Sequence, residues 1–185
     1  MKIPCILLLI FCGFKVHAQM SFDTIAVKAE LKAIFERDQK TRKGTDSVAF
    51  INYIDSCNQA QVTALIDKYG WLGKSAVGNY NQVLFLVIQH ADLATQEKYF
   101  PMLQESVNKG ESSKSDAAML QDRIVMRKGI KQIYGSQVVF NKTGGQEFYP
   151  IDDEKNVNLR RASVGMQPIE EYAKYFGIEY KLPKE

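Results

Sequence analysis

The chain has 185 residues, of which 45% are hydrophobic and 11% aromatic, and its formal net charge at neutral pH is +3. This composition is typical of a folded globular protein and excludes intrinsic disorder as its general state. The net charge falls to +1 without Lys2 and Lys15, so nothing indicates a partner such as nucleic acid or an anionic membrane surface.

The first 18 residues have the organisation of a secretory signal peptide. Lys2 supplies a positive start, residues 3–14 are mainly apolar, and Val16-His17-Ala18 fits the small-x-small cleavage pattern. The apolar stretch is shorter than the roughly 20 residues that span a bilayer, so we expect cleavage rather than an anchor. We therefore expect a bacterial chain exported to the periplasm or secreted, with no stable membrane insertion afterwards.

Cleavage after Ala18 would leave residues 19–185, a length that fits one domain with a substantial core. Cys57 is the only cysteine in that part, so no internal disulfide can form and stability must come from packing. His90 is its only histidine, and zinc usually takes several histidine or cysteine ligands. We therefore expect no metal and no cofactor.

Hydrophobic periodicity predicts that most of the mature chain is helical. Apolar residues recur at the i, i+3, i+4 and i+7 spacing of one helix face, and caps or glycines mark several ends. The predicted helices are residues 22–40, 46–69 with Asp46 as N-cap, 95–109, 115–128 with Ser115 as N-cap, 157–164, and 168–176. The glycine-rich segment 70–78 between them is predicted to be an ordered loop.

Residues 83–88 are apolar on every side, so periodicity alone does not separate a buried helix from a buried strand. We predict a helix because polar residues extend the run by full turns on both sides. Residues 132–140 and 146–151 favour strands, and the turn-like segment 141–145 lies between them. The predicted fold is therefore mainly α (α+β), a single compact helical domain with a small β-hairpin near residues 132–151.

His90 follows the most apolar segment of the chain and is the leading candidate for a functional residue. An imidazole titrates near physiological pH and can act as a general acid or base. A helix C-terminus would favour the protonated ring and burial the neutral one, so the sequence leaves the sign of the pKa shift open. The alternative is a histidine that only packs in the core. Asp92 lies two residues further on and is expected to cap a helix rather than face His90.

Five charged residues extend or interrupt apolar helix faces and are expected to lie inside the fold. Charges that face a core need partners, because an unpaired buried charge is costly. They can pair with one another, they can receive a carboxylate or phosphate of a ligand, or their long stems can reach water. These residues are Asp38, Arg42, Arg123, Arg160 and Arg161.

Short motifs in a fixed order across residues 34–172 resemble a bacterial domain family of unknown function, number 6624. They are Arg37-Asp38-Gln39 with Arg42, Gly70-Trp71, Ser75-x-Val77-Gly78, Gln89-His90-Ala91-Asp92, Asp122-Arg123, Tyr134-Gly135-Ser136-Gln137, Pro150-Ile151 and Arg160-Arg161. The family carries threonine and proline where this chain has Ser136 and Leu72, which speaks against Ser136 as an obligatory nucleophile. The resemblance implies no activity, but it includes the charged positions that the periodicity singles out.

Two hypotheses follow from the sequence. In the first, the inward polar residues line a pocket for a small or peptide-like anionic ligand, and the pocket can carry hydrolytic activity. His90 is then the catalytic acid or base and Asp38 its orienting carboxylate, while the ligand-binding residues are Arg42, Arg123, Tyr134, Gln137, Arg160 and Arg161. In the second, the chain is a noncatalytic cell-envelope module that binds a protein or glycan, and the internal ion pairs only fix helix packing.

Overall fold

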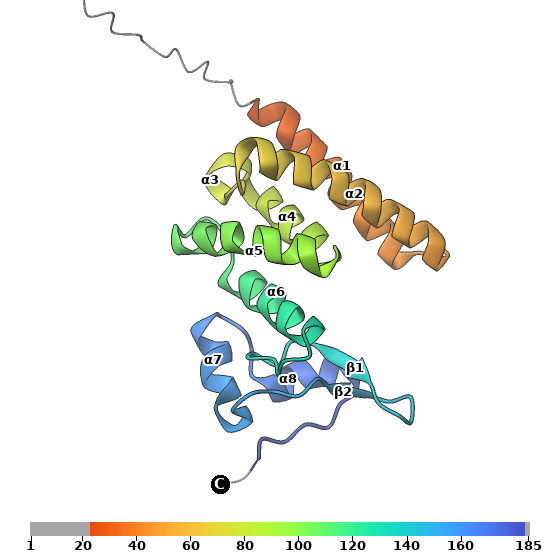
Figure 1. Cartoon of the computed structure of the whole chain (residues 1–185), viewed down its shortest axis with the longest axis vertical. Coiled ribbons are helices and arrows are strands. Elements are labelled where there is room, and N and C mark those ends of the chain that lie inside the picture. The colour runs from red at the N-terminus through yellow and green to blue at the C-terminus, as the bar shows by residue number, and fades with distance from the viewer. Residues whose placement is uncertain (1–22, 184–185) are drawn as a thin grey trace, which may run out of the picture.

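Helices form most of the chain in this computed structural model, which describes residues 23–183 (Figure 1). A two-stranded sheet accompanies them, so the predicted mainly α fold with a small hairpin is confirmed. The predicted signal peptide lies outside the described residues. Within them, no helix combines the length and the apolar character that crossing a membrane requires.

The first two helices form an antiparallel pair (Figure 1). Helix α1 spans Thr24–Lys43, and α2 spans Val48–Tyr69 and stops at Gly70, where φ is 78°. The hydroxyl of Ser47 accepts the Phe50 N–H, so the N-cap is one residue later than predicted. The pair buries the predicted apolar faces together with three polar side chains, Asp38, Thr41 and Asn58.

The segment predicted as an ordered loop contains a short helix, α3 (Lys74–Val77), and a 3-10 turn, η1 (Gly78–Tyr80). The loop prediction was therefore wrong for this part, because one helical turn after Gly73 is too short to show periodicity. The carbonyl of Glu111 fixes the segment by accepting the Lys74 N–H (2.9 Å) and the Asn81 side-chain amide (2.8 Å).

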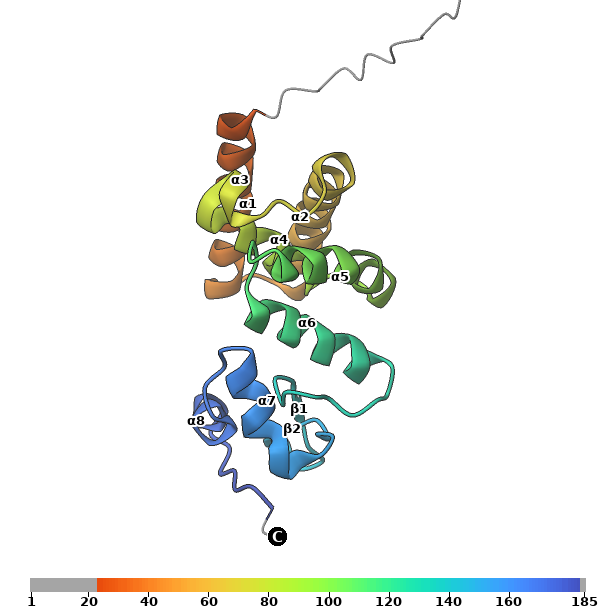
Figure 2. The ribbon, with the colours of Figure 1, turned by 90° about the vertical axis from the view of Figure 1, so that its left-hand side faces the viewer.

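Helix α4 (Asn81–Ile88) follows and confirms the prediction of a helix rather than a strand. It lies against α1, α2, α5 and α6, so most of its side chains are buried, which explains its apolar character on all sides. Helix α5 (Leu93–Asn108) has Asp92 as its N-cap. Helix α6 (Lys114–Arg127) has Ser113 as its N-cap, two residues before the predicted one. Figure 2 shows α6 with α5 above it and α7 below it.

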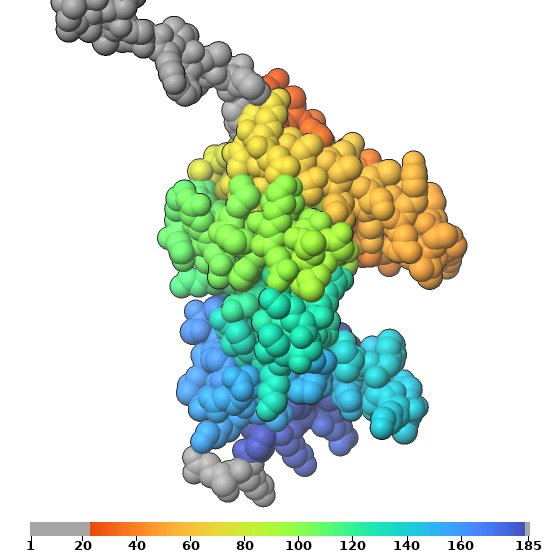
Figure 3. Space-filling model, in the orientation of Figure 1, coloured from red at the N-terminus to blue at the C-terminus, as the bar shows by residue number. Residues whose placement is uncertain are grey.

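The C-terminal part is smaller and has its own apolar cluster of Ile151, Val157 and Ile169. Strands β1 (Val138–Phe140) and β2 (Gln146–Phe148) pair antiparallel, and both are shorter than predicted. Turn η2 (Glu154–Asn156), helices α7 (Val157–Ser163) and α8 (Ile169–Ala173), and turn η3 (Lys174–Phe176) complete it. Helix α6 lies between this part and the N-terminal helices in both ribbon and surface views (Figures 1 and 3).

Candidate functional site

His90 lies in the turn that joins α4 to α5. Its backbone N–H donates to the Val87 carbonyl (3.1 Å), and its side chain is half-buried. The imidazole makes no hydrogen bond to any residue between 23 and 183. Asp92 does not face it, because the Asp92 carboxylate caps α5 by accepting the Thr95 N–H at 2.7 Å.

Two arginines of α6 hold the peptide groups on either side of His90. Arg123 Nη1 donates to the Gln89 carbonyl at 3.0 Å, and Arg127 Nη1 donates to the Ala91 carbonyl at 2.5 Å. Neither guanidinium has a carboxylate within ion-pair distance among the described residues. Arg123 Nη2 and Arg127 Nη2 donate to no atom of those residues, so both groups keep N–H donors for another acceptor.

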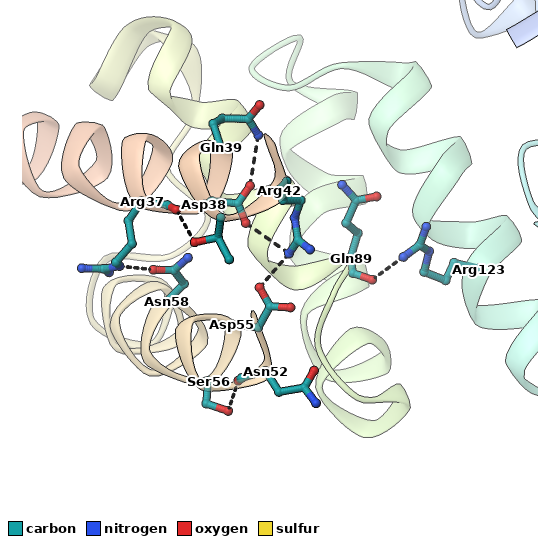
Figure 4. Close-up of polar contacts among 11 residues, drawn as sticks. Arg37, Asp38, Gln39, Arg42, Asn52, Asp55, Ser56, Asn58, Gln89 and Arg123 are labelled. Atoms are coloured by element: carbon teal, nitrogen blue, oxygen red, sulfur yellow. Dashed lines mark hydrogen bonds and ion pairs between the residues drawn. The ribbon is translucent and has the colours of Figure 1, made fainter. Parts of the chain in front are cut away.

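A third arginine approaches from α1. Arg42 Nη2 donates to Asp38 Oδ1 (3.2 Å) and to Asp55 Oδ1 (2.6 Å), and 29% of its side chain is exposed. Asp38 is buried, as its position on the apolar face predicted, and it also accepts the Gln39 side-chain amide at 3.0 Å. Figure 4 shows Arg42 between the two carboxylates, with Gln89 and Arg123 on the side towards α6.

The electrostatic surroundings keep the His90 imidazole neutral. Burial, and after it the positive charges of Arg42, Arg123 and Arg127, together lower its pKa from 6.5 to about 4. Asp38 bonds to Arg42 and not to the imidazole, so no described carboxylate offsets this effect at the ring. The sequence left open whether the His90 pKa is raised or lowered, and the structure shows that it is lowered. At pH 7 a neutral ring therefore lies among three guanidinium groups.

Asp122, which the sequence analysis named only within the Asp122-Arg123 motif of the family resemblance, holds the loop before the hairpin. Its side chain is completely buried, and its carboxylate accepts the backbone N–H groups of Ile133 (2.7 Å), Tyr134 (3.0 Å) and Ser136 (3.0 Å). The signal for Asp122 in the sequence was its place in that motif, beside Arg123 on an amphipathic helix. Three N–H donors compensate a buried carboxylate, so the role of Asp122 is to fix this loop.

Arg160 and Arg161 bind the carbonyl groups of the same loop. Arg161 is 2% exposed; its Nη1 donates to the Tyr134 carbonyl at 2.7 Å and its Nε to the Gln167 carbonyl at 2.7 Å. Arg160 Nε donates to the Ile133 carbonyl at 2.7 Å. The structure therefore does not bring these two arginines to His90. Together with Asp122 they form a loop-holding network.

Gln137 connects the loop-holding network to the arginines near His90. Its Oε1 accepts Arg123 Nε at 3.1 Å, and its Nε2 donates to the Ser136 hydroxyl at 2.9 Å. The Tyr134 hydroxyl has no hydrogen bond within residues 23–183. Its side chain instead lines a separate surface pocket of 440 Å³ between α5, α6 and α7, which does not include His90.

The predicted residues thus divide into two groups. Asp38, Arg42, His90 and Arg123 come together, and two unpredicted residues join them. Asp55 was missed because it lies beside the apolar face of α2, and Arg127 because it lies at the end of α6. Among the described residues, no group of three or more histidine, cysteine, aspartate or glutamate side chains could hold a metal ion.

A family model described as a family of unknown function (DUF6624) matches residues 24–184. The match covers almost all of the described structure, including α1 with Asp38 and Arg42, the turn with His90, the arginines of α6 and the loop-holding network. No curated protein and no solved structure matches the chain.

Proposed function

The chain belongs to the DUF6624 family, and we propose that it is a ligand-binding domain that recognises an anionic group on a small or peptide-like molecule. The binding site in this proposal is the arginine cluster, defined as Arg42, Arg123 and Arg127 around His90. A planar guanidinium with free N–H groups suits a carboxylate or a phosphate, which it can bind with two parallel hydrogen bonds.

The observation that carries the proposal is the state of the two arginines of α6. Each binds a backbone carbonyl beside His90 and therefore has a fixed position. Two carboxylates contact Arg42, but none lies within ion-pair distance of Arg123 or Arg127 in the described part of the chain. A partly desolvated positive cluster without enough carboxylates favours an anion from outside.

Hydrolysis is the second candidate, and the unprotonated imidazole meets one of its requirements. A general base must be unprotonated, and His90 meets this condition at neutral pH because its pKa is about 4. Asp38 would then act through Arg42 rather than as the orienting partner of the imidazole. The noncatalytic cell-envelope module remains the competing proposal, and the backbone contacts of Arg160 and of the buried Arg161 support a structural role for those two charges.

We also propose that the chain is exported by residues 1–18 and acts in the periplasm or outside the cell. The support is the charge, length and cleavage pattern of that segment in the sequence. Fractionation of cells that express the full chain, with N-terminal sequencing of the product, tests this. A cytoplasmic protein that retains Met1–Ala18 would contradict it.

The test of anion binding is an NMR titration of the His90 ring with inorganic phosphate and, separately, with succinate. An anion bound among the arginines adds negative charge beside the ring, so the His90 pKa should rise on binding. We expect Arg127→Gln to weaken phosphate binding at least tenfold. Lys128→Gln is the matched control, because it removes the same charge one residue away from a side chain that pairs with Glu97 at 2.8 Å.

A His90 pKa that neither anion changes would argue against the site. Equal losses of affinity in Arg127→Gln and Lys128→Gln would show only a general charge effect and would also contradict the proposal. Hydrolysis is tested separately with ester and amide substrates that carry a terminal carboxylate. The anion-binding proposal survives if His90→Gln still binds succinate but no variant turns over a substrate.

A further inference from the structure

A small surface pocket borders the loop-holding network and includes neither His90 nor a member of the arginine cluster. It measures 210 Å³ and lies between α6, the loop before the hairpin, and the segment that joins α7 to α8. Its lining includes Met119, Ser136, Arg161, Met166 and Tyr172. Ser136 and Arg161 are only 7% and 2% exposed, so two buried polar side chains form part of this pocket.

The guanidinium group of Arg161 keeps two N–H groups without an acceptor. Its Nε donates to the Gln167 carbonyl at 2.7 Å, and its Nη1 donates to the carbonyls of Tyr134 at 2.7 Å and Gly135 at 3.3 Å. Nη2 donates to no atom of residues 23–183. It is not one of the unpartnered side-chain atoms that are sealed from solvent in that range, so its N–H groups open onto the pocket that Arg161 lines.

The positive charge of Arg161 has no ion pair to neutralise it. Across the described residues, no carboxylate lies within ion-pair distance of its guanidinium group. Burial lowers the pKa of Arg161, and the nearby Tyr172, Asp122 and Glu170 offset this effect only in part. A buried charge without an ion pair is costly, and a single negative charge in the pocket would compensate it. The pocket therefore favours a monoanion.

Ser136 supplies a second donor to the same pocket. Its Oγ accepts a hydrogen bond from Gln137 Nε2 at 2.9 Å, and its own O–H donates to no atom between residues 23 and 183. The pocket thus offers two N–H groups and one O–H group but only one positive charge. A carboxylate suits this set, because one of its oxygens can accept from Arg161 Nη2 and the other from the Ser136 hydroxyl.

Much of the remaining lining is apolar. The Tyr172 ring lies against the guanidinium group, with 4.8 Å between Arg161 Cζ and the ring centroid. The Tyr172 hydroxyl donates to the Ser136 carbonyl at 3.1 Å, which holds the ring in place. Met119 and Met166 add flexible thioether side chains, which adapt to apolar groups of different shape. An apolar group attached to the carboxylate would therefore find contacts here.

We propose that this pocket binds a small monocarboxylate with a short apolar or aromatic body. Arg161 Nη2 and the Ser136 hydroxyl hold its carboxylate, and its body lies against Tyr172 and the two methionines. A free acid and the C-terminus of a peptide with an apolar last side chain present the same chemistry. This site is distinct from the arginine cluster and gives the free N–H groups of Arg161 a role beyond holding the loop.

The experiment is an NMR titration of protein with isotope-labelled methionine methyl groups. Benzoate is the probe for a free acid, N-acetylphenylalanine is the probe for a peptide C-terminus, and benzamide is the control with the same ring and no charge. We expect at least one acid to shift the methyl groups of Met119 and Met166. The methyl groups of Met102 and Met126, which lie outside the pocket, and the His90 ring should not respond.

The matched pair of variants is Arg161→Met and Arg160→Met. Arg160 also binds the loop carbonyls, but it does not line the pocket. We expect Arg161→Met to raise the dissociation constant of the bound acid at least about tenfold and Arg160→Met to leave it unchanged. Ser136→Ala removes the second donor and keeps the charge, so it should weaken binding about threefold to tenfold even if Arg161→Met fails to fold.

Four results would overturn the proposal. They are no shift of Met119 and Met166 with either acid, an equal shift with benzamide, equal losses of affinity in the two arginine variants, and unchanged affinity in both Arg161→Met and Ser136→Ala. A response of the His90 ring in place of the two methionines would put the acid in the arginine cluster and would also overturn it. The anion-binding proposal is read from His90 alone, so either proposal can fail without the other.

Discussion

The depressed pKa of His90 makes a quantitative prediction about stability in acid. The folded protein holds this pKa at about 4, whereas the unfolded chain has the usual value of 6.5. Between these values the unfolded state binds more protons, so the stabilisation is complete above pH 6.5 and is lost as the pH falls through 4. At about 1.4 kcal/mol per pKa unit the full loss is about 3 kcal/mol, of which about 2 kcal/mol is lost between pH 8 and 5.

Asp116 acts in the opposite direction over part of the same range. Its pKa is raised from 3.8 to about 6, so the folded protein binds more protons than the unfolded chain between these values. Its contribution therefore becomes more favourable as the pH falls, by about 1.4 kcal/mol between pH 8 and 5. The wild-type pH profile sums both effects and understates the contribution of His90.

The comparison that isolates the imidazole is between wild type and His90→Gln, because Asp116 is common to both. Relative to His90→Gln, we expect the unfolding free energy of the wild type to fall by about 2 kcal/mol between pH 8 and 5. Urea unfolding followed by circular dichroism at pH 8, 7, 6 and 5 measures it. A difference that stays constant within about 0.5 kcal/mol would refute a buried neutral imidazole, since the two proteins would then take up equal numbers of protons on unfolding.

Three further predictions concern the loop-holding network. Asp122→Ala leaves three loop N–H groups without their acceptor and should lower the unfolding free energy by about 3–5 kcal/mol in urea titrations, whereas loss of less than about 1 kcal/mol would mean that water replaces it. Arg161→Met should cost about 2–4 kcal/mol in the same assay and leave phosphate affinity unchanged at the same temperature, and a selective loss of phosphate binding would place Arg161 in the anion site instead. Gly135→Ala should cost at least about 2 kcal/mol, since Gly135 has φ of 65° and a Cβ there would lie 2.5 Å from Ile169 Cδ1; an unchanged melting temperature in calorimetry would contradict this.

The sequence predicts those features that depend on local periodicity. The helical faces of α1 and α2 and the burial of Asp38 follow from apolar spacing along single helices, whereas α4 was predicted from the polar residues that extend its apolar run by full turns. Caps were displaced by one or two residues because a second capping residue lies close by at each start, Ser47 beside Asp46 and Ser113 two residues before Ser115, and either side chain can accept the N–H. The short helix α3 was missed because four residues contain too little of a period.

The partners of the charged residues were less predictable. The sequence indicated that Arg160 and Arg161 need partners. Arg160 pairs with the Asp153 carboxylate at 3.3 Å, but the other partners of the two arginines are backbone carbonyls of residues 133–135, 152, 153 and 167, which carry no sequence signal. Every residue has a carbonyl, so only the fold determines which one an arginine reaches. The pairing of Arg42 with Asp55 similarly depends on the approach of α1 and α2, across 13 residues of sequence.

Helix α6 connects the structural and the proposed functional parts, because consecutive side chains on it point in different directions. Asp122 faces the loop before the hairpin, and Arg123 faces the carbonyl of Gln89. Arg123 is also held by Gln137, which belongs to the loop that Asp122 fixes, so its guanidinium is bound from both sides and only its outer N–H groups stay free. The loop-holding network thus positions a member of the arginine cluster. A binding site needs such support, since a ligand gains affinity when its contacts are already ordered.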